Sequence, residues 1–156
     1  MGYEVGVETI VEVRPLAVLR RCARPEQFSK VVPECCGVVW STLKAHGVKG
    51  AGRHVAVYWD DVVNLEVGVE MEGEFSGCGE VVRSALPVGV VVRTIHLGPY
   101  QKLGEAHAAV KGWCARNGYA LAGPKWEIYG HWLEEWNRDA SKIRTDVFYL
   151  VRGDRE

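Results

Sequence analysis

His96-Leu97-Gly98-Pro99-Tyr100 and Trp126-Glu127-Ile128-Tyr129 bracket a segment that reads as one amphipathic helix. This helix is predicted from about Tyr100 to Arg116, and Asn117-Gly118 is typical of a helix C-terminus. The two bracketing stretches belong to apolar runs of strand character. The apolar stripe of the predicted helix is formed by Leu103, Ala106, His107, Val110, Trp113 and Cys114. The centre of this chain therefore predicts a strand, a helix and a second strand in succession.

Glu127 is a single carboxylate within an apolar, aromatic strand. Because strand side chains alternate, Glu127 and Tyr129 share one face, while Trp126 and Ile128 share the other. Removing a carboxylate from water is costly unless a positive or hydrogen-bonding group meets it. Three partners are open at this point: an internal base, a cationic ligand, or a proton that makes Glu127 a catalytic acid.

The remaining elements are predicted from periodicity and turn residues. The first half reads as a strand over Thr9–Arg20 interrupted at Pro15, a helix over Glu34–His46 that stops at Gly47, and strands over His54–Trp59 and Asn64–Met71. The second half reads as strands over Val81–Arg83 and Gly89–His96, the helix over Tyr100–Arg116, and strands over Lys125–Trp132 and Thr145–Val151.

The two halves repeat one plan. Trp40 lies as far before Gly50 as Trp113 lies before Gly123. We interpret this as a duplicated β-α-β-β unit, with pseudo-repeats at about residues 9–71 and 81–151 of a single domain over residues 1–156. The predicted class is α+β, with two main helices.

The alignment of the repeats also bears on Glu127. Tyr58 ends the strand after the first helix much as Tyr129 ends the strand after the second. Matching these tyrosines places Ala56 opposite Glu127. The scaffold therefore does not require a carboxylate at this position, which favours a functional role for it.

Composition excludes several classes of protein. Nineteen basic and 20 acidic residues give a net charge of −1, without the basic stripe that nucleic-acid binding needs. The five cysteines include no C-x-x-C pair, so neither a disulfide framework nor a metal site is predicted. The N-terminus lacks a signal-peptide pattern, and no run of about 18 apolar residues exists. We expect a cytoplasmic protein with no membrane association and no direct contact with nucleic acid.

In its motifs the chain resembles the GyrI-like small-molecule-binding family, which includes effector-binding domains of multidrug-sensing transcription activators and has the SOUL haem-binding proteins as fold relatives. The motifs are Leu86-Pro87-Val88-Gly89, His96–Tyr100, Leu103-Gly104, Trp113, Asn117-Gly118-Tyr119, Gly123-Pro124, Trp126–Tyr129 and Arg144–Tyr149. The resemblance implies a duplicated β-α-β-β fold that forms an antiparallel sheet with two helices, and a ligand groove between the helices and the sheet.

The resemblance also implies a function. Glu127 matches a glutamate that meets lipophilic cations among aromatic rings, and aromatic faces attract cations. We therefore expect a standalone protein that senses or sequesters amphipathic, cationic aromatic molecules. The ligand-binding residues expected are Glu127, Tyr129, Tyr58, Tyr100, Trp40, Trp113, Trp132 and His96.

Two alternatives stay open within the resemblance. Some relatives are hydrolases that open electrophilic cyclopropane-type natural products, and in such an enzyme Glu127 and Tyr129 would be the catalytic residues. We lean towards a protein without enzymatic activity. Other relatives inhibit gyrase, so gyrase or another protein is a possible partner.

Structural roles compete with these expectations. Glu127 could pair with Lys125, Arg144 or another base of the fold, since ion-pair networks also hold buried carboxylates. His46 and His107 lie on helical stripes and are expected to be satisfied core histidines. His96 is a single histidine without further ligand signals, so haem and other cofactors are not expected.

Overall fold

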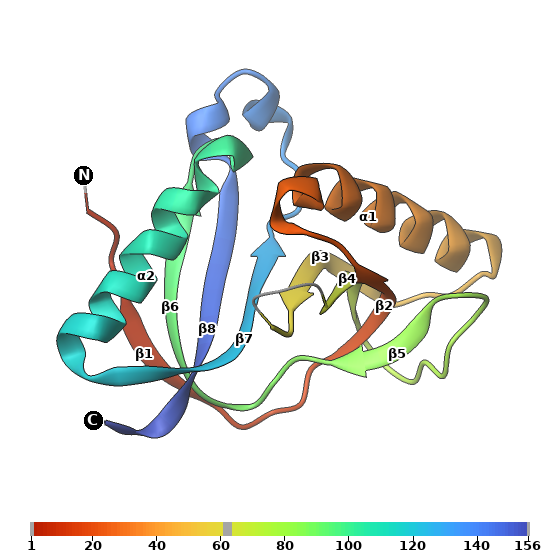
Figure 1. Ribbon diagram of the computed structural model, residues 1–156. Coiled ribbons are helices and arrows are strands. Elements are labelled where there is room, and N and C mark those ends of the chain that lie inside the picture. Colours follow the sequence, from red (N-terminus) through yellow and green to blue (C-terminus); the bar gives the residue numbers. More distant parts are fainter. Residues whose placement is uncertain (1, 61–63, 156) are drawn as a thin grey trace. The chain divides into compact units, whose positions relative to one another are not determined.

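The computed structural model describes residues 2–60 and 64–155, which divide into two compact units (Figure 1). The α1 unit comprises residues 12–60 and 64–87, and the α2 unit comprises residues 2–11 and 88–155. The α1 unit contains β2 (Pro15–Cys22), η1 (Pro25–Gln27), α1 (Phe28–Ala45), β3 (Ala51–Tyr58), β4 (Asn64–Met71) and β5 (Val82–Ala85). The α2 unit contains β1 (Gly6–Ile10), β6 (Gly89–Leu97), η2 (Tyr100–Lys102), α2 (Leu103–Asn117), β7 (Tyr119–Tyr129), η3 (Glu134–Asn137), η4 (Ala140–Lys142) and β8 (Arg144–Arg155).

Both units are built on the same plan. In the α1 unit the strands lie in the order β3-β4-β2-β5, and in the α2 unit in the order β7-β8-β6-β1, with antiparallel pairing throughout. Each unit thus contains a β-α-β-β succession, β2-α1-β3-β4 or β6-α2-β7-β8. The predicted α+β class with duplicated β-α-β-β units is confirmed.

The strand β1 shows where the predicted repeats differ from the two units. β1 pairs with β6 of the α2 unit, although its residues precede the whole α1 unit. The strand expected over Thr9–Arg20 with an interruption at Pro15 is therefore two strands in different units, and the second of them begins at Pro15. That the whole chain forms one domain stays a prediction.

The helix α1 begins at Phe28, six residues before the predicted start. Pro33 lies inside it, where it removes one backbone donor but does not end the helix. The buried stripe of α1 explains the longer span, since Val32 continues the spacing of Cys35, Val39 and Leu43. The helix ends at Ala45, and Gly47 follows with φ 67°, as predicted.

The strand β7 spans Tyr119–Tyr129, whereas the sequence predicts Lys125–Trp132. In the sequence, Gly123 makes the early part of β7 resemble a turn. In the structure, Gly123 adopts φ 119°, a conformation that favours glycine. Irregular register between Tyr119 and Lys125 accommodates this turn within the ladder with β8. Trp132 lies outside the strand, so its assignment to β7 is wrong.

The helix α2 covers one face of its sheet, along β6 and β8 in Figure 1. The core there consists of Val92, Ala106, Val110, Cys114, Val147, Tyr149 and Val151. Glu127 pairs in register with Val147, and directly opposite residues of an antiparallel pair share a face. Glu127 therefore lies on the face that α2 covers.

The close approach of β2 and β4 gives a test of the fold. A Cβ atom on Gly68 would overlap the carbonyl oxygen of Ala17, whereas Gly37 of α1 has open space around it. We expect Gly68→Ala to lower the free energy of unfolding by about 1–3 kcal/mol. Gly37→Ala should raise it by about 1 kcal/mol through helix propensity. Denaturant titrations measure both, and a Gly68→Ala protein of wild-type stability would contradict the described strand contact.

Candidate functional site

Four side chains form one hydrogen-bonded chain, which we call the Glu127 network. The hydroxyl of Tyr129 donates to Glu127 Oε1 at 2.5 Å, and His107 Nε2 lies 2.6 Å from Glu127 Oε2. On the other side of the imidazole, His107 Nδ1 lies 2.7 Å from the hydroxyl of Tyr149. Glu127 is only 6% exposed. The network joins α2 to both β7 and β8.

Donor and acceptor chemistry fixes part of this arrangement. An ionised carboxylate only accepts, so beside ionised Glu127 the Nε2 atom of His107 carries a proton. The hydroxyl of Tyr149 can either donate to Nδ1 or accept from it. Both the neutral and the positive form of His107 are therefore satisfied. With Glu127 ionised and both tyrosines neutral, the network carries a net charge of −1 or 0.

His107 is an internal base beside Glu127. This contact corresponds to the third sequence alternative, another base of the fold, rather than to Lys125 or Arg144. The guanidinium of Arg144 binds Asp146 at 2.8 Å, and this hydrogen bond, with the charge of Asp146, raises the pKa of Arg144. Lys125 Nζ lies 5.8 Å from the centroid of the Tyr149 ring, in a cation–π contact.

The histidine predictions have different outcomes. His107 is a satisfied histidine, as expected, and its side chain is 16% exposed. His46 is exposed at the end of α1, so its prediction as a core residue is wrong. The link from His107 to Glu127 was missed, although each is a polar residue on an otherwise apolar, buried face, and that shared feature is the available signal.

Tyr100 and Tyr129 lie together at this site. Their ring centroids are 5.8 Å apart in an edge-on arrangement, and Tyr100 is 42% exposed. The structure thus brings Glu127, Tyr129 and Tyr100 into one neighbourhood. Trp113 instead stacks on Tyr119 near the C-terminal end of α2, with centroids 5.5 Å apart.

The remaining predicted aromatic residues are Trp132 of the α2 unit and Tyr58 and Trp40 of the α1 unit. Trp132 is exposed, and its indole N–H donates to Asn137 Oδ1 at 3.0 Å. In the α1 unit, Tyr58 is buried with its ring centroid 4.9 Å from that of Phe28, and Trp40 is exposed on α1. Their participation in ligand binding stays a prediction.

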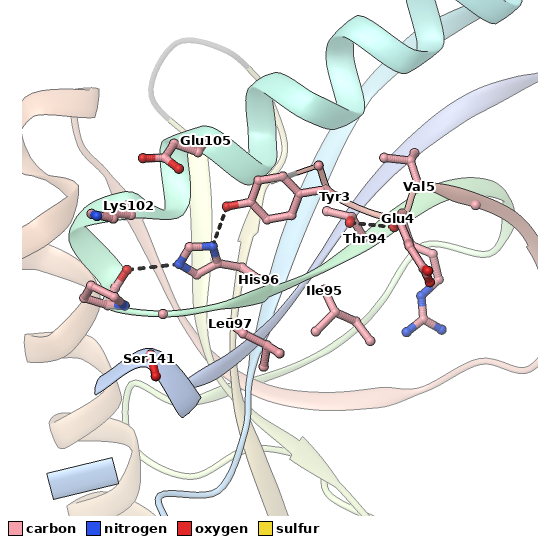
Figure 2. Close-up of a pocket in the computed structure, with 15 residues that line it drawn as sticks. Tyr3, Glu4, Val5, Thr94, Ile95, His96, Leu97, Lys102, Glu105 and Ser141 are labelled. Carbon is pink, nitrogen blue, oxygen red and sulfur yellow. Dashed lines mark hydrogen bonds between the residues drawn. The ribbon is translucent and has the colours of Figure 1, made fainter. Parts of the chain in front are cut away.

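His96 lines a cavity of about 950 Å³ in the α2 unit, whose lining includes neither Glu127 nor Tyr129 (Figure 2). The buried His96 ring has Nε2 3.0 Å from the carbonyl of Pro99 and Nδ1 2.9 Å from the hydroxyl of Tyr3. Burial, followed by the charge of Glu105, raises the pKa of Tyr3. Because both ring nitrogens are engaged, ligation of haem iron would require breaking one of these contacts.

Within residues 2–60 and 64–155, no group of three or more His, Cys, Asp or Glu side chains is placed to hold a metal ion. All five cysteines are free thiols, and burial with the neighbouring Cys35 raises the pKa of Cys36 to about 12. None of the helices in the described part of the chain is long and apolar enough to span a membrane.

The α1 unit offers an internal comparison for the Glu127 network. The buried stripes of the helices match at one offset, Cys35, Val39 and Leu43 with Ala106, Val110 and Cys114. The same offset matches Cys36 to His107 and Ala56 to Glu127, and the strand registers then match Val69 to Tyr149. The fold therefore forms without this network, as the alignment of Ala56 with Glu127 indicated.

Known proteins share this fold. No protein-family model matches the chain, and no curated protein matches it. Among solved structures, the EcmrR C-terminal domain is 21% identical with a TM-score of 0.77, covering 99% of this chain and 100% of that one. EcmrR in its DNA complex gives a TM-score of 0.74 at 21% identity, covering 97% of this chain but 58% of that chain.

Of two further structures with this fold, one is bound to an organic cation and the other is described as a hydrolase. SAV2435 bound to tetraphenylphosphonium is 13% identical with a TM-score of 0.65, covering 98% of this chain and 95% of that one. A hydrolase from Listeria innocua is 10% identical with a TM-score of 0.63, covering 97% and 93%. At these identities the shared property is the fold. The chain shares the fold of these structures, in agreement with the fold that the sequence resemblance implied.

The hydrogen bond from Tyr129 gives a stability test of the site. Tyr129→Phe removes one donor from a buried carboxylate, and we expect a loss of about 1–3 kcal/mol in the free energy of unfolding. Tyr119→Phe on the same strand is the control, because its hydroxyl has no hydrogen bond among the described residues. It should change stability by less than about 0.5 kcal/mol. Equal effects in denaturant titrations would contradict the Tyr129–Glu127 bond.

Proposed function

We propose that this protein reversibly binds amphipathic, cationic aromatic molecules, as a sensing or sequestering protein, with the Glu127 carboxylate as counter-charge. The observation that carries the proposal is a nearly buried carboxylate whose neighbours are a tyrosine hydroxyl and an imidazole. With His107 neutral, these neighbours orient the carboxylate without cancelling its charge. A charge held away from water interacts more strongly with an incoming cation than a solvated one does.

Aromatic surface supports the same ligand class. Tyr100 is partly open to solvent and contacts the ring of Tyr129, which itself binds Glu127. An aromatic cation could enter along these rings and meet the carboxylate behind them, gaining both cation–π and hydrophobic contact. Tetraphenylphosphonium bound to SAV2435, which has the same fold, makes this class of molecule the natural probe.

Calorimetric titration with tetraphenylphosphonium tests this function. We expect measurable binding by the wild type and at least about tenfold weaker binding by Glu127→Gln, since the amide keeps the shape but loses the charge. Glu74→Gln, at an exposed site of the α1 unit, makes the same change in net charge and should bind as the wild type does. Equal affinity of wild type and Glu127→Gln would contradict the proposed role of Glu127 as counter-charge.

A hydrolase is the second candidate, favoured by the short hydrogen bonds that link Glu127 to Tyr129 and His107. Glu127 could take a proton from water, and Tyr129 could donate one to the group that leaves. The described hydrolase from Listeria innocua with this fold supports the possibility.

Product analysis separates the two candidates. A hydrolase incubated with a strained cyclopropane-type alkylator should yield ring-opened product in many-fold excess over protein. Glu127→Gln should reduce the rate by about two orders of magnitude or more, in line with loss of general acid–base catalysis. Protection of the alkylator in a one-to-one ratio, without turnover, would leave binding as the function.

A further inference from the structure

His107 contacts Glu127 directly and can adjust the charge that Glu127 offers to a ligand. Its two ring nitrogens contact Glu127 at 2.6 Å and the Tyr149 hydroxyl at 2.7 Å. Since a hydroxyl both donates and accepts, adding a proton to His107 requires only that the hydrogen of Tyr149 rotate. No heavy atom has to move, so the network has two hydrogen-bonded charge states in one geometry.

These two states differ in what they offer a cation. With neutral His107, the imidazole leaves the negative charge of Glu127 uncancelled. With protonated His107, a positive imidazole lies at hydrogen-bond distance from the carboxylate and cancels it. An incoming cation is then attracted by Glu127 and repelled by His107 at similar range, and poor solvation makes both effects larger.

Charged and titratable groups on the surrounding elements complete the electrostatic setting. Those on the elements packed around His107 include Glu127, Tyr129 and Lys125 of β7, Tyr149 and Asp146 of β8, His96 and Arg93 of β6, Tyr3 before β1, Tyr100 and Lys102 of η2, and Glu105 and Lys111 of α2. His96 has its own contacts with Tyr3 and Pro99, and Asp146 binds Arg144. Among these groups, His107 alone is an imidazole in direct contact with Glu127.

We propose that His107 is the specificity-determining partner of Glu127, so that binding of an organic cation expels a proton from the His107–Glu127 pair. This proposal rests on the cation-binding function proposed above. The protein then exchanges one proton for one positive charge of the ligand. The proton belongs to the coupled pair, whichever of the two side chains holds it before the ligand arrives.

The direction of the pH dependence follows from this exchange. The deprotonated network binds the cation, so affinity is greatest above the titration of the pair and falls as pH decreases through it. Histidine ordinarily changes charge between about pH 5 and 8. In that range, affinity should weaken by up to about tenfold for each pH unit of acidification, the limit for release of one proton.

Calorimetry with tetraphenylphosphonium between pH 5.5 and 8.5 tests the exchange, because this probe carries a permanent charge and no proton. Titrations in buffers with different ionisation enthalpies count the protons released. The wild type should release up to one proton at the acid end of the range and almost none at pH 8.5. His107→Gln keeps an N–H donor for Glu127 but cannot titrate, so it should bind with no proton release and little pH dependence.

His46→Gln is the matched control, since it removes an exposed histidine of the α1 unit and should release protons as the wild type does. Binding that weakens in Glu127→Gln but does not vary with pH in the wild type would overturn the proton exchange and leave the cation-binding function standing. Proton release that persists in His107→Gln would overturn it as well. Absence of binding at every pH would overturn both proposals.

A measurement on the unaltered protein avoids dependence on the folding of a variant. Nuclear magnetic resonance follows the ring protons of each histidine against pH, with and without saturating tetraphenylphosphonium. The ligand should shift the titration of His107 to lower pH and leave that of His46 in place. An unchanged or upward-shifted His107 titration would overturn the proposal.

Discussion

The contact between Glu127 and His107 is the interaction on which the candidate site of the α2 unit depends. A carboxylate removed from water needs donors, and leaving one buried without a partner costs several kcal/mol. The donors come from Tyr129 on the same strand and from His107 on α2. Because α2 also buries its apolar stripe on β6 and β8, one rotation of the helix satisfies the apolar core and the carboxylate together.

The duplicated plan makes this network informative. The α1 unit builds the same β-α-β-β arrangement with Cys36, Ala56 and Val69 at the corresponding positions, and none of these brings a buried charge. A network that the fold does not require, and that buries a carboxylate, has to be explained by something other than stability. Replacing buried ion pairs with apolar residues is often neutral or stabilising in proteins, so the polar set is more readily explained by binding or proton transfer.

Much of the fold could be predicted from local pattern. The strand Asn64–Met71 has its predicted bounds, and α2 ends at Asn117 with Gly118 at φ 75°, since glycine pays no steric cost in that conformation. The predictions for β7 and α1 failed where a tertiary contact overrides a local signal. Gly123 is absorbed as an irregularity in a ladder with β8, and Pro33 lies in a helix whose first turns extend the buried stripe.

The candidate site, like the fold, could be predicted from the sequence only in part. Strand alternation by itself determined that Glu127 and Tyr129 share a face, because the period of two is a property of the extended backbone. The comparison of the repeats also marked the carboxylate as an addition to the scaffold. Only the tertiary structure decided that its base is His107 and that Tyr149 completes the chain. His107 lies 20 positions from Glu127 along the sequence and 42 positions from Tyr149. Such contacts depend on how a helix is rotated over a sheet, which no local pattern specifies.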